Sequence, residues 1–214
     1  MEVGGTIYDC ADAPAATLPD GNVLVQASPG TYEEPSHFWE FSISKTGTVT
    51  ATQVNDPKEA PNDPSYFGNL LLLPTGQVLW DDSQDPTPEV SVYTPQGKAK
   101  KKWEPVVSSV STTLTVGSTG NAISGTNFNG WDLGGTYGDD SQEATNWPIV
   151  KITNTSSGDV CYGHSYDFST MGVWTTGKTN ATFDVPSTCE TGASTLQVVV
   201  NGIASKAVSV TLNS

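Results

Sequence analysis

Two stretches of the chain repeat the same order of hydrophobic and turn-forming residues. Residues 13–25 and 68–80 each hold an apolar run, a Pro-x-Gly turn and a second apolar run. The turns are Leu18-Pro19-Asp20-Gly21 and Leu73-Pro74-Thr75-Gly76, which are offset by 55 positions. Short apolar runs joined by a glycine turn are typical of β-hairpins. Each copy is followed by a loop and an aromatic run, at 38–41 and 90–93, so the pattern predicts a third strand in each unit.

This repeat predicts a particular architecture for the first half of the chain. A period of about 50 residues with several strands per unit is typical of a blade of a kelch-type β-propeller. We therefore predict two kelch-like four-stranded blades, a partial propeller, in residues 1–102. A closed propeller needs about four blades. Two blades leave open strand edges, so we expect self-association, or completion by blades missing from this chain.

The second half has a different rhythm of short apolar runs. Alternation such as that in Leu196-Gln197-Val198 places one face of a strand in a core. Short strands at regular spacing are typical of an immunoglobulin-like β-sandwich, which we predict for residues 103–214. The fold class is therefore all-β. The expected strands are 106–110, 112–116, 121–125, 149–154, 160–164, 181–185, 195–201 and 207–212.

The charge pattern excludes one class of partner. The formal net charge is −14, and all nine cationic residues are lysines. Nucleic-acid binding requires a basic face, and bidentate anion recognition usually requires arginine. We therefore expect no nucleic-acid partner. Residues 98–102 hold four of the lysines, a run that contacts an acidic partner or is simply solvated.

The length of the apolar runs and the number of cysteines bear on where the protein is located. No apolar run approaches the 18 residues or more of a membrane span, and the first residues lack the basic start and apolar core of a signal peptide. Three cysteines leave at least one unpaired. Cys161 lies in a predicted strand and Cys189 at a turn before another strand, so we predict that these two form a disulfide and that Cys10 is free or intermolecular.

Acidic residues offer a weak candidate cation site. Asp81, Asp82, Asp85 and Glu89 are close in sequence, but they lack the alternating spacing and closing glutamate of a calcium-binding EF-hand loop. The alternative is that they keep a β-rich surface soluble and discourage edge pairing.

Three tryptophans stand beside turn residues. Trp131 follows Asn129-Gly130, Trp147 follows Asn146, and Trp174 precedes Thr175. Flat rings beside asparagine side chains suit a pyranose, which stacks its C–H face on the ring while the amides bind hydroxyls. The alternative is that these rings cap the sandwich core, as we expect for Trp39, Trp80 and Trp103.

Several motifs together resemble the C-terminal part of a galactose-oxidase/glyoxal-oxidase-like kelch-repeat protein. They are residues 18–25, 60–66, 71–78, Ser169-Thr170-Met171-Gly172-Val173 and residues 200–205. The resemblance implies blades followed by an immunoglobulin-like domain, and export from the cell. It also implies, in the catalytic members, one copper held by two tyrosines and two histidines.

The copper ligands of that family look replaced here. The family's Tyr-His pair reads Tyr66-Phe67, and a phenyl ring cannot bind metal. The stretch matched to the second histidine carries Tyr166 and Phe168. His164 shares a strand face with them by the two-residue period. Only two histidines are present, which disfavours a strong copper or zinc site.

These observations predict an extracellular, non-catalytic binding or assembly module on a degenerate oxidase scaffold. Its partner is expected to be a polysaccharide or other glycan, with no cofactor, and the candidate binding residues are Tyr66, His164, Tyr166 and the three loop tryptophans. One alternative is a copper radical oxidase acting on a sugar or aldehyde, with copper as its cofactor. Another is a structural subunit that assembles with copies of itself.

Overall fold

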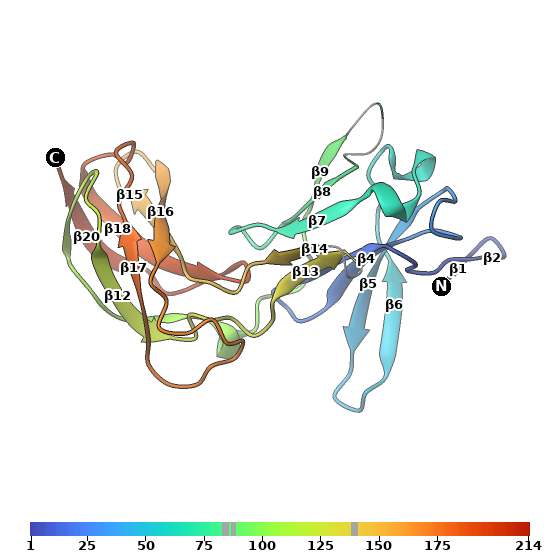
Figure 1. Ribbon diagram of the computed structural model, residues 1–214, viewed down its shortest axis with the longest axis horizontal. Coiled ribbons are helices and arrows are strands. Elements are labelled where there is room, and N and C mark those ends of the chain that lie inside the picture. Colours follow the sequence, from blue (N-terminus) through green and yellow to red (C-terminus); the bar gives the residue numbers. More distant parts are fainter. Residues whose placement is uncertain (83–85, 87–88, 138–140) are drawn as a thin grey trace. The chain divides into compact units, whose positions relative to one another are not determined.

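The computed structural model describes residues 1–82, 86, 89–137 and 141–214 of the chain, and it is an all-β structure (Figure 1). Within these residues the strands form four hydrogen-bonded sheets. Three short 3-10 helices connect them: η1 (Ala60–Asn62), η2 (Ser65–Phe67) and η3 (Lys101–Trp103). In the same residues no helix is long and apolar enough to cross a membrane.

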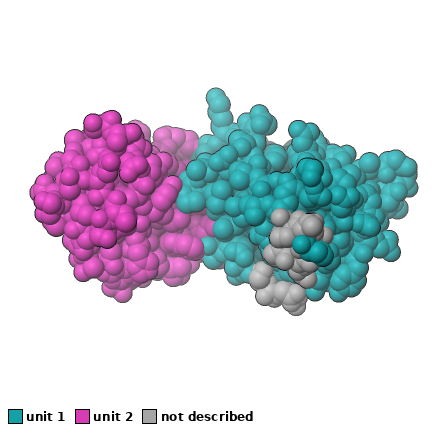
Figure 2. Space-filling model, turned by 90° about the horizontal axis from the view of Figure 1, so that it is seen from above, with its two compact units in different colours: residues 1–100, 134–144 teal, residues 101–133, 145–214 magenta. Residues whose placement is uncertain are grey.

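The chain divides into two compact units, coloured separately in Figure 2. Unit 1 contains residues 1–100 and 134–144, and unit 2 contains residues 101–133 and 145–214. The predicted boundary at 102/103 is therefore close, but the second segment is not continuous as predicted. Residues 134–144 belong to unit 1 because their first strand pairs with a strand near the N-terminus, with Gly135 opposite Ala16 and Tyr137 opposite Pro14.

Unit 1 has a six-stranded sheet in the order β14-β13-β3-β4-β5-β6, a three-stranded sheet in the order β7-β8-β9, and the pair β1-β2. All neighbouring strands in these sheets are antiparallel. The strands are β1 (Glu2–Val3), β2 (Thr6–Ile7), β3 (Pro14–Thr17), β4 (Val23–Ala27), β5 (His37–Ile43), β6 (Val49–Gln53), β7 (Asn69–Leu72), β8 (Val78–Asp81), β9 (Val90–Tyr93), β13 (Gly134–Tyr137) and β14 (Ser141–Ala144).

The two sequence repeats form hairpins with the same turn bonding, as predicted. In the β3–β4 turn the Gly21 N–H donates to the Leu18 carbonyl at 2.8 Å, and in the β7–β8 turn the Gly76 N–H donates to the Leu73 carbonyl at 2.9 Å. Both glycines have a positive φ, 87° and 83°, which other residues rarely adopt. The aromatic third strands are β5 and β9, also as predicted.

Buried residues from both sheets of unit 1 share one core. Trp80 of β8 lies edge-on to Phe38 of β5, with ring centroids 5.7 Å apart. The Trp80 indole N–H donates to the Gln26 side-chain oxygen at 2.9 Å, and the Gln26 amide donates to Ser36 Oγ at 2.8 Å. The buried glutamine thus connects the two sheets while leaving none of these polar groups unsatisfied.

Unit 2 has one nine-stranded sheet, ordered β10-β12-β17-β16-β15-β18-β20-β11, with β19 paired to β18. All eight strands predicted for this half are present, with ends that differ by at most three residues from those predicted. The strands are β10 (Val106–Val110), β11 (Thr113–Thr115), β12 (Asn121–Thr126), β15 (Ile149–Asn154), β16 (Val160–Tyr166), β17 (Thr179–Asp184), β18 (Gly192–Val200), β19 (Ile203–Ala204) and β20 (Val208–Asn213).

The core of unit 2 follows from the alternation in these strands. Leu196, Val198 and Val200 of β18 are all buried and pack with Val150 and Ile152 of β15. Cys161 and Cys189 form the predicted disulfide at the edge of this cluster, and Cys10 is free and exposed.

Candidate functional site

Three loops of unit 2 are joined around the buried side chain of Asn201, in the turn between β18 and β19. Its Oδ1 accepts a hydrogen bond from the Trp131 backbone N–H at 3.1 Å. Its Nδ2 donates to the Asp132 carbonyl at 3.0 Å and to Thr145 Oγ1 at 2.9 Å. Gly130 permits this approach, since a Cβ there would lie 1.9 Å from Asn201 Oδ1. Asn201 therefore fixes loop 127–133 against loop 145–148.

A fourth loop, residues 167–178, is bonded to the same group. The Trp174 backbone N–H donates to the Gly130 carbonyl at 2.9 Å. The Asn146 amide donates to the Met171 carbonyl at 3.2 Å, and the Asn129 amide donates to the Thr170 carbonyl. These bonds join three loops, residues 127–133, 145–148 and 167–178, into one surface, which we name the tryptophan surface. It carries Trp131, Trp147 and Trp174, the three tryptophans that were predicted to bind a sugar.

The tryptophans differ in their surroundings. The Trp131 ring is half-buried and stacks on Trp103, with centroids 3.9 Å apart and planes 10° from parallel. Trp174 is 46% exposed, and its φ of 55° is unusual for a bulky residue. Trp147 is half-buried. The surface thus carries one stacked pair of rings and, on a loop bonded to the same segment, the more exposed ring of Trp174.

Two buried polar atoms at the tryptophan surface have no hydrogen-bond partner among the described residues. They are the side-chain oxygen of Asn129 and the indole nitrogen of Trp131. A buried polar group without a partner costs about 1–3 kcal/mol, so such groups are uncommon in folded proteins. One is an acceptor and the other a donor, and a sugar hydroxyl or a water molecule supplies both kinds of partner.

His164 and Tyr166 form a separate cluster on β16. Their rings stack with centroids 5.5 Å apart, as the shared strand face predicts, and His164 is exposed. The Tyr166 hydroxyl donates to Asp184 Oδ1 at 2.8 Å, and His164 Nδ1 lies 4.0 Å from Asp184 Oδ2. The hydrogen bond to Asp184 raises the pKa of Tyr166 above its usual range, with smaller contributions from burial and the charge of Asp184. This hydroxyl is therefore a neutral, structural donor at physiological pH.

Tyr66 lies in unit 1, in the 3-10 helix η2. Its ring contacts those of Tyr32 and Tyr137, at centroid distances of 4.7 and 5.9 Å, and its carbonyl accepts a hydrogen bond from the Tyr137 hydroxyl at 2.8 Å. Tyr137 belongs to β13, so the Tyr66 cluster helps to fasten the inserted hairpin to unit 1.

The acidic candidates serve the local backbone. Asp82 is buried and accepts a hydrogen bond from the Glu89 N–H. Glu89 in turn accepts from Ser91 Oγ at 2.8 Å and from the Glu59 N–H at 2.9 Å, and the Asn69 amide lies 3.4 Å from Asp81. Asp85 lies outside the described residues. Among the residues described, no three His, Cys, Asp or Glu side chains are placed to hold a metal, so we derive no calcium or copper chemistry.

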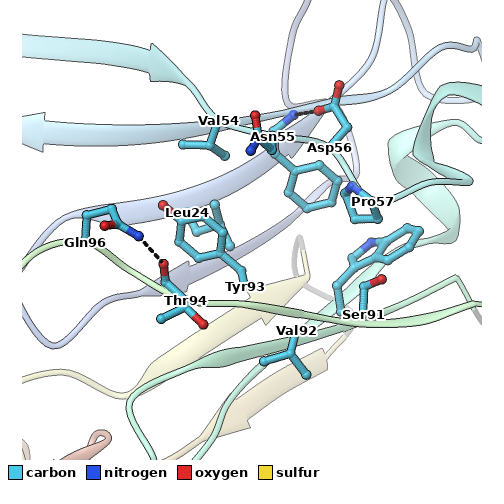
Figure 3. Close-up of a pocket in the computed structure, with 12 residues that line it drawn as sticks. Leu24, Val54, Asn55, Asp56, Pro57, Ser91, Val92, Tyr93, Thr94 and Gln96 are labelled. Atoms are coloured by element: carbon cyan, nitrogen blue, oxygen red, sulfur yellow. Dashed lines mark hydrogen bonds between the residues drawn. The ribbon is translucent and has the colours of Figure 1, made fainter.

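Unit 1 contains a cavity of about 660 Å³. Figure 3 shows Asn55, Asp56 and Pro57 along one side and Ser91 to Thr94 along the other. Several of its polar groups are already paired: Asp56 Oδ2 lies 2.7 Å from His37 Nδ1, and Asp56 Oδ1 accepts from the Phe38 N–H at 2.9 Å. The Tyr93 hydroxyl donates to Glu40 at 2.6 Å. These bonds connect β5 to its neighbours, so the cavity offers a ligand few uncommitted groups.

Sequence reasoning missed the roles of two residues that build the tryptophan surface. Trp103 was expected to cap a core, yet it is the ring on which Trp131 stacks. Asn129, beside Trp131, was part of the predicted sugar platform, whereas no role was predicted for Asn201. The Asn201-Gly202 pair is a hairpin-turn signal, but the partners of the Asn201 side chain lie about 56 to 70 positions away and cannot be read from local sequence.

Comparison with known proteins adds no assignment, since no family model and no curated protein sequence matches the chain. The resemblance to galactose-oxidase-like proteins therefore rests on the sequence motifs alone.

Proposed function

We propose that this protein is an extracellular, non-catalytic carbohydrate-binding module, and that it holds a glycan at the tryptophan surface of unit 2. The observation that carries the proposal is the pair of buried atoms without a partner among the described residues, Asn129 Oδ1 and Trp131 Nε1, in the loop whose Gly130 carbonyl accepts from the N–H of the exposed Trp174. Aromatic rings with a few converging polar groups are the usual composition of a sugar site.

The proposal includes the scaffold predicted from sequence, two kelch-like blades followed by an immunoglobulin-like sandwich of the galactose-oxidase type. The equivalent turn bonding of the two hairpins in unit 1 supports the blades. The eight regularly spaced strands of unit 2 support the sandwich. Phe67, where the family has a copper-binding histidine, supports the loss of oxidase chemistry.

The extracellular location is supported by the Cys161–Cys189 disulfide. Disulfides persist mainly in oxidising compartments and are rare in the cytosol. The location is also what the family resemblance implies.

The test is binding to cellulose, chitin and galactan, measured as depletion of the protein from solution. Trp174→Ala removes an exposed ring, so it leaves the core intact, and we expect at least a tenfold loss of affinity. Stacking of an aromatic ring contributes about 1–3 kcal/mol in other ring-recognition sites, which is consistent with that loss. Tyr162→Ala is the matched control, because Tyr162 is 41% exposed on β16, apart from these loops.

Trp131→Ala removes the stacked ring and is the second variant. Equal binding by the parent, Trp174→Ala and Trp131→Ala, or no binding by the parent to these three glycans or to polygalacturonate and a sulfated galactan, would contradict the proposal.

A further inference from the structure

Unit 2 contains a cavity near Trp103, the ring on which Trp131 of the tryptophan surface stacks. The cavity, of about 470 Å³, is lined by Lys101, Lys102 and Lys206, and we name it the lysine pocket. Its apolar wall consists of Val106, Val107 and Val208. Its lining also includes the carboxylate of Glu104, which pairs with Lys101. The pocket therefore combines an excess of cationic groups with aliphatic surface, a combination that suits an anionic ligand with an apolar C–H face.

The pocket stands out against the charge of the molecule. Unit 1 has four lysines and seventeen acidic residues, a net charge of −13, whereas unit 2 has five lysines and six acidic residues, a net charge of −1. Three of the five lysines in unit 2 line this pocket. An anionic ligand is repelled by most of this protein and meets its least unfavourable surface here.

Two of the three lysines form no ion pair with a carboxylate among the described residues. Lys101 pairs with Glu104, but none of the ion pairs among the described residues involves Lys102 or Lys206. The segment that carries Lys102 is held in place, since the Asn127 amide donates to the carbonyls of Lys102 and Glu104 at 3.3 and 3.1 Å. The pocket thus presents two ammonium groups without a carboxylate partner among the described residues, one of them on an anchored backbone.

The lysine pocket is connected to the tryptophan surface through ring contacts. The Lys102 ammonium lies 5.4 Å from the centroid of the Trp103 ring, and Trp103 stacks on Trp131 at 3.9 Å. A chain of contacts therefore leads from the cationic rim through the stacked pair to the loop that carries the two unpartnered atoms.

We infer that the ligand is an anionic polysaccharide, whose sugar ring lies on the tryptophan surface while a carboxylate or sulfate group enters the lysine pocket. This inference rests on the proposed function, because it names the class of glycan bound at the same surface. Lysine binds either group as a point charge and lacks the planar geometry with which arginine selects carboxylates. The two sources of negative charge, a uronate and a sulfated sugar, are therefore distinguished by experiment.

The experiment is affinity electrophoresis in gels containing polygalacturonate, a sulfated galactan or neutral galactan. The variants are Lys102→Gln, Lys206→Gln and the double variant, with Lys151→Gln as the matched control, because Lys151 is a unit 2 lysine on β15. Each exposed charge contact accounts for a factor of about three in affinity. We expect the double variant to bind at least one anionic polymer about tenfold more weakly and to bind neutral galactan as the parent does. We also expect the parent's preference for that anionic polymer over neutral galactan to weaken as the salt concentration is raised from 20 to 300 mM, since salt screens charge contacts.

The outcomes separate this inference from the proposed function. Equal binding to neutral and anionic polymers, or unchanged anionic binding in the double lysine variant, would overturn the anionic specificity alone. Anionic binding that depends on the lysines but survives Trp174→Ala would confirm the lysine pocket and contradict the tryptophan surface. Dependence of the anionic binding on both sets of residues would confirm both.

Discussion

Asn201 is the residue whose replacement tests most directly how the tryptophan surface is held together. It occupies the two-residue turn between β18 and β19, in which Val200 pairs with Ile203. Asn201 and Gly202 have φ values of 46° and 68°, the pattern of a type I′ turn that favours Asn-Gly. The side chain is buried and makes three hydrogen bonds, to the Trp131 N–H, the Asp132 carbonyl and Thr145 Oγ1.

The magnitude follows from these contacts. Three hydrogen bonds at about 1 kcal/mol each predict that Asn201→Gly lowers the free energy of unfolding of unit 2 by about 3 kcal/mol. Asn201→Ala loses the same bonds and also places a Cβ-bearing residue that disfavours the left-handed region at φ 46°, which costs about 1 kcal/mol more. We therefore expect alanine to be the more destabilising substitution, by about 4 kcal/mol in total.

The assay is urea unfolding followed by tryptophan fluorescence and circular dichroism. The transition of unit 2 is identified as the one that Tyr93→Phe, a unit 1 variant, does not shift. Both Asn201 variants are also expected to bind glycan more weakly, because the Trp131 loop loses its anchor. If Asn201→Ala and Asn201→Gly lower the free energy of unfolding equally, and each by less than about 1 kcal/mol, the reasoning that the buried amide holds these loops is refuted.

Three further predictions address other features of the fold. The Cys161→Ser/Cys189→Ser variant opens a loop of 28 residues and is expected to lower the unfolding free energy of unit 2 by about 3.5 kcal/mol, measured by urea unfolding, whereas Cys10→Ser is not. Burial, together with the bond to Glu40, raises the pKa of Tyr93 above its usual value of about 10, so the stabilising effect of the Tyr93 hydroxyl is complete below pH 10 and is lost as pH rises toward the folded-state pKa. The difference in unfolding free energy between the parent and Tyr93→Phe should be about 1.5 kcal/mol at pH 7 and should shrink above pH 10. Val90 and Val92 of the edge strand β9 are 66% and 50% exposed, so we expect the chain to self-associate through this edge. Val92→Lys should lower the mass measured by light scattering at high concentration, whereas the control Val160→Lys, on the interior strand β16, should not. A mass of the parent protein that does not depend on concentration would exclude the association.

Sequence reasoning recovered the features that local chemistry determines. The two glycine turns and the alternation of apolar residues were enough to locate both repeated hairpins and the eight strands of unit 2, because a turn and a half-buried strand each need particular residue types at short range. The disulfide was also recovered, since both cysteines stood beside predicted strands.

The inserted hairpin of residues 134–144 could not be predicted in the same way. Its first strand begins Gly134-Gly135, which has little strand propensity. The glycines are needed because β13 approaches other backbone closely: a Cβ on Gly135 would lie 2.9 Å from the Leu70 carbonyl oxygen. Its pairing partner, β3, lies about 120 positions earlier, and no local pattern encodes a pairing at that separation.

The contrast between the two units explains why we place binding in unit 2. In unit 1 several buried and half-buried polar groups bond to one another across strands, as Gln26 does with Trp80 and Glu40 does with Tyr93, although Asp82 Oδ2 has no hydrogen-bond partner among the described residues. A ligand that enters the cavity of unit 1 has to break such bonds, and it meets an acidic surface. In unit 2 the loops around Asn201 leave an acceptor and a donor unpaired beside accessible aromatic surface, next to two lysines without acidic partners among the described residues. An unpaired buried polar group lowers the stability of the fold. The two unpaired groups at this surface are therefore stabilised when a ligand or a bound water forms hydrogen bonds with them.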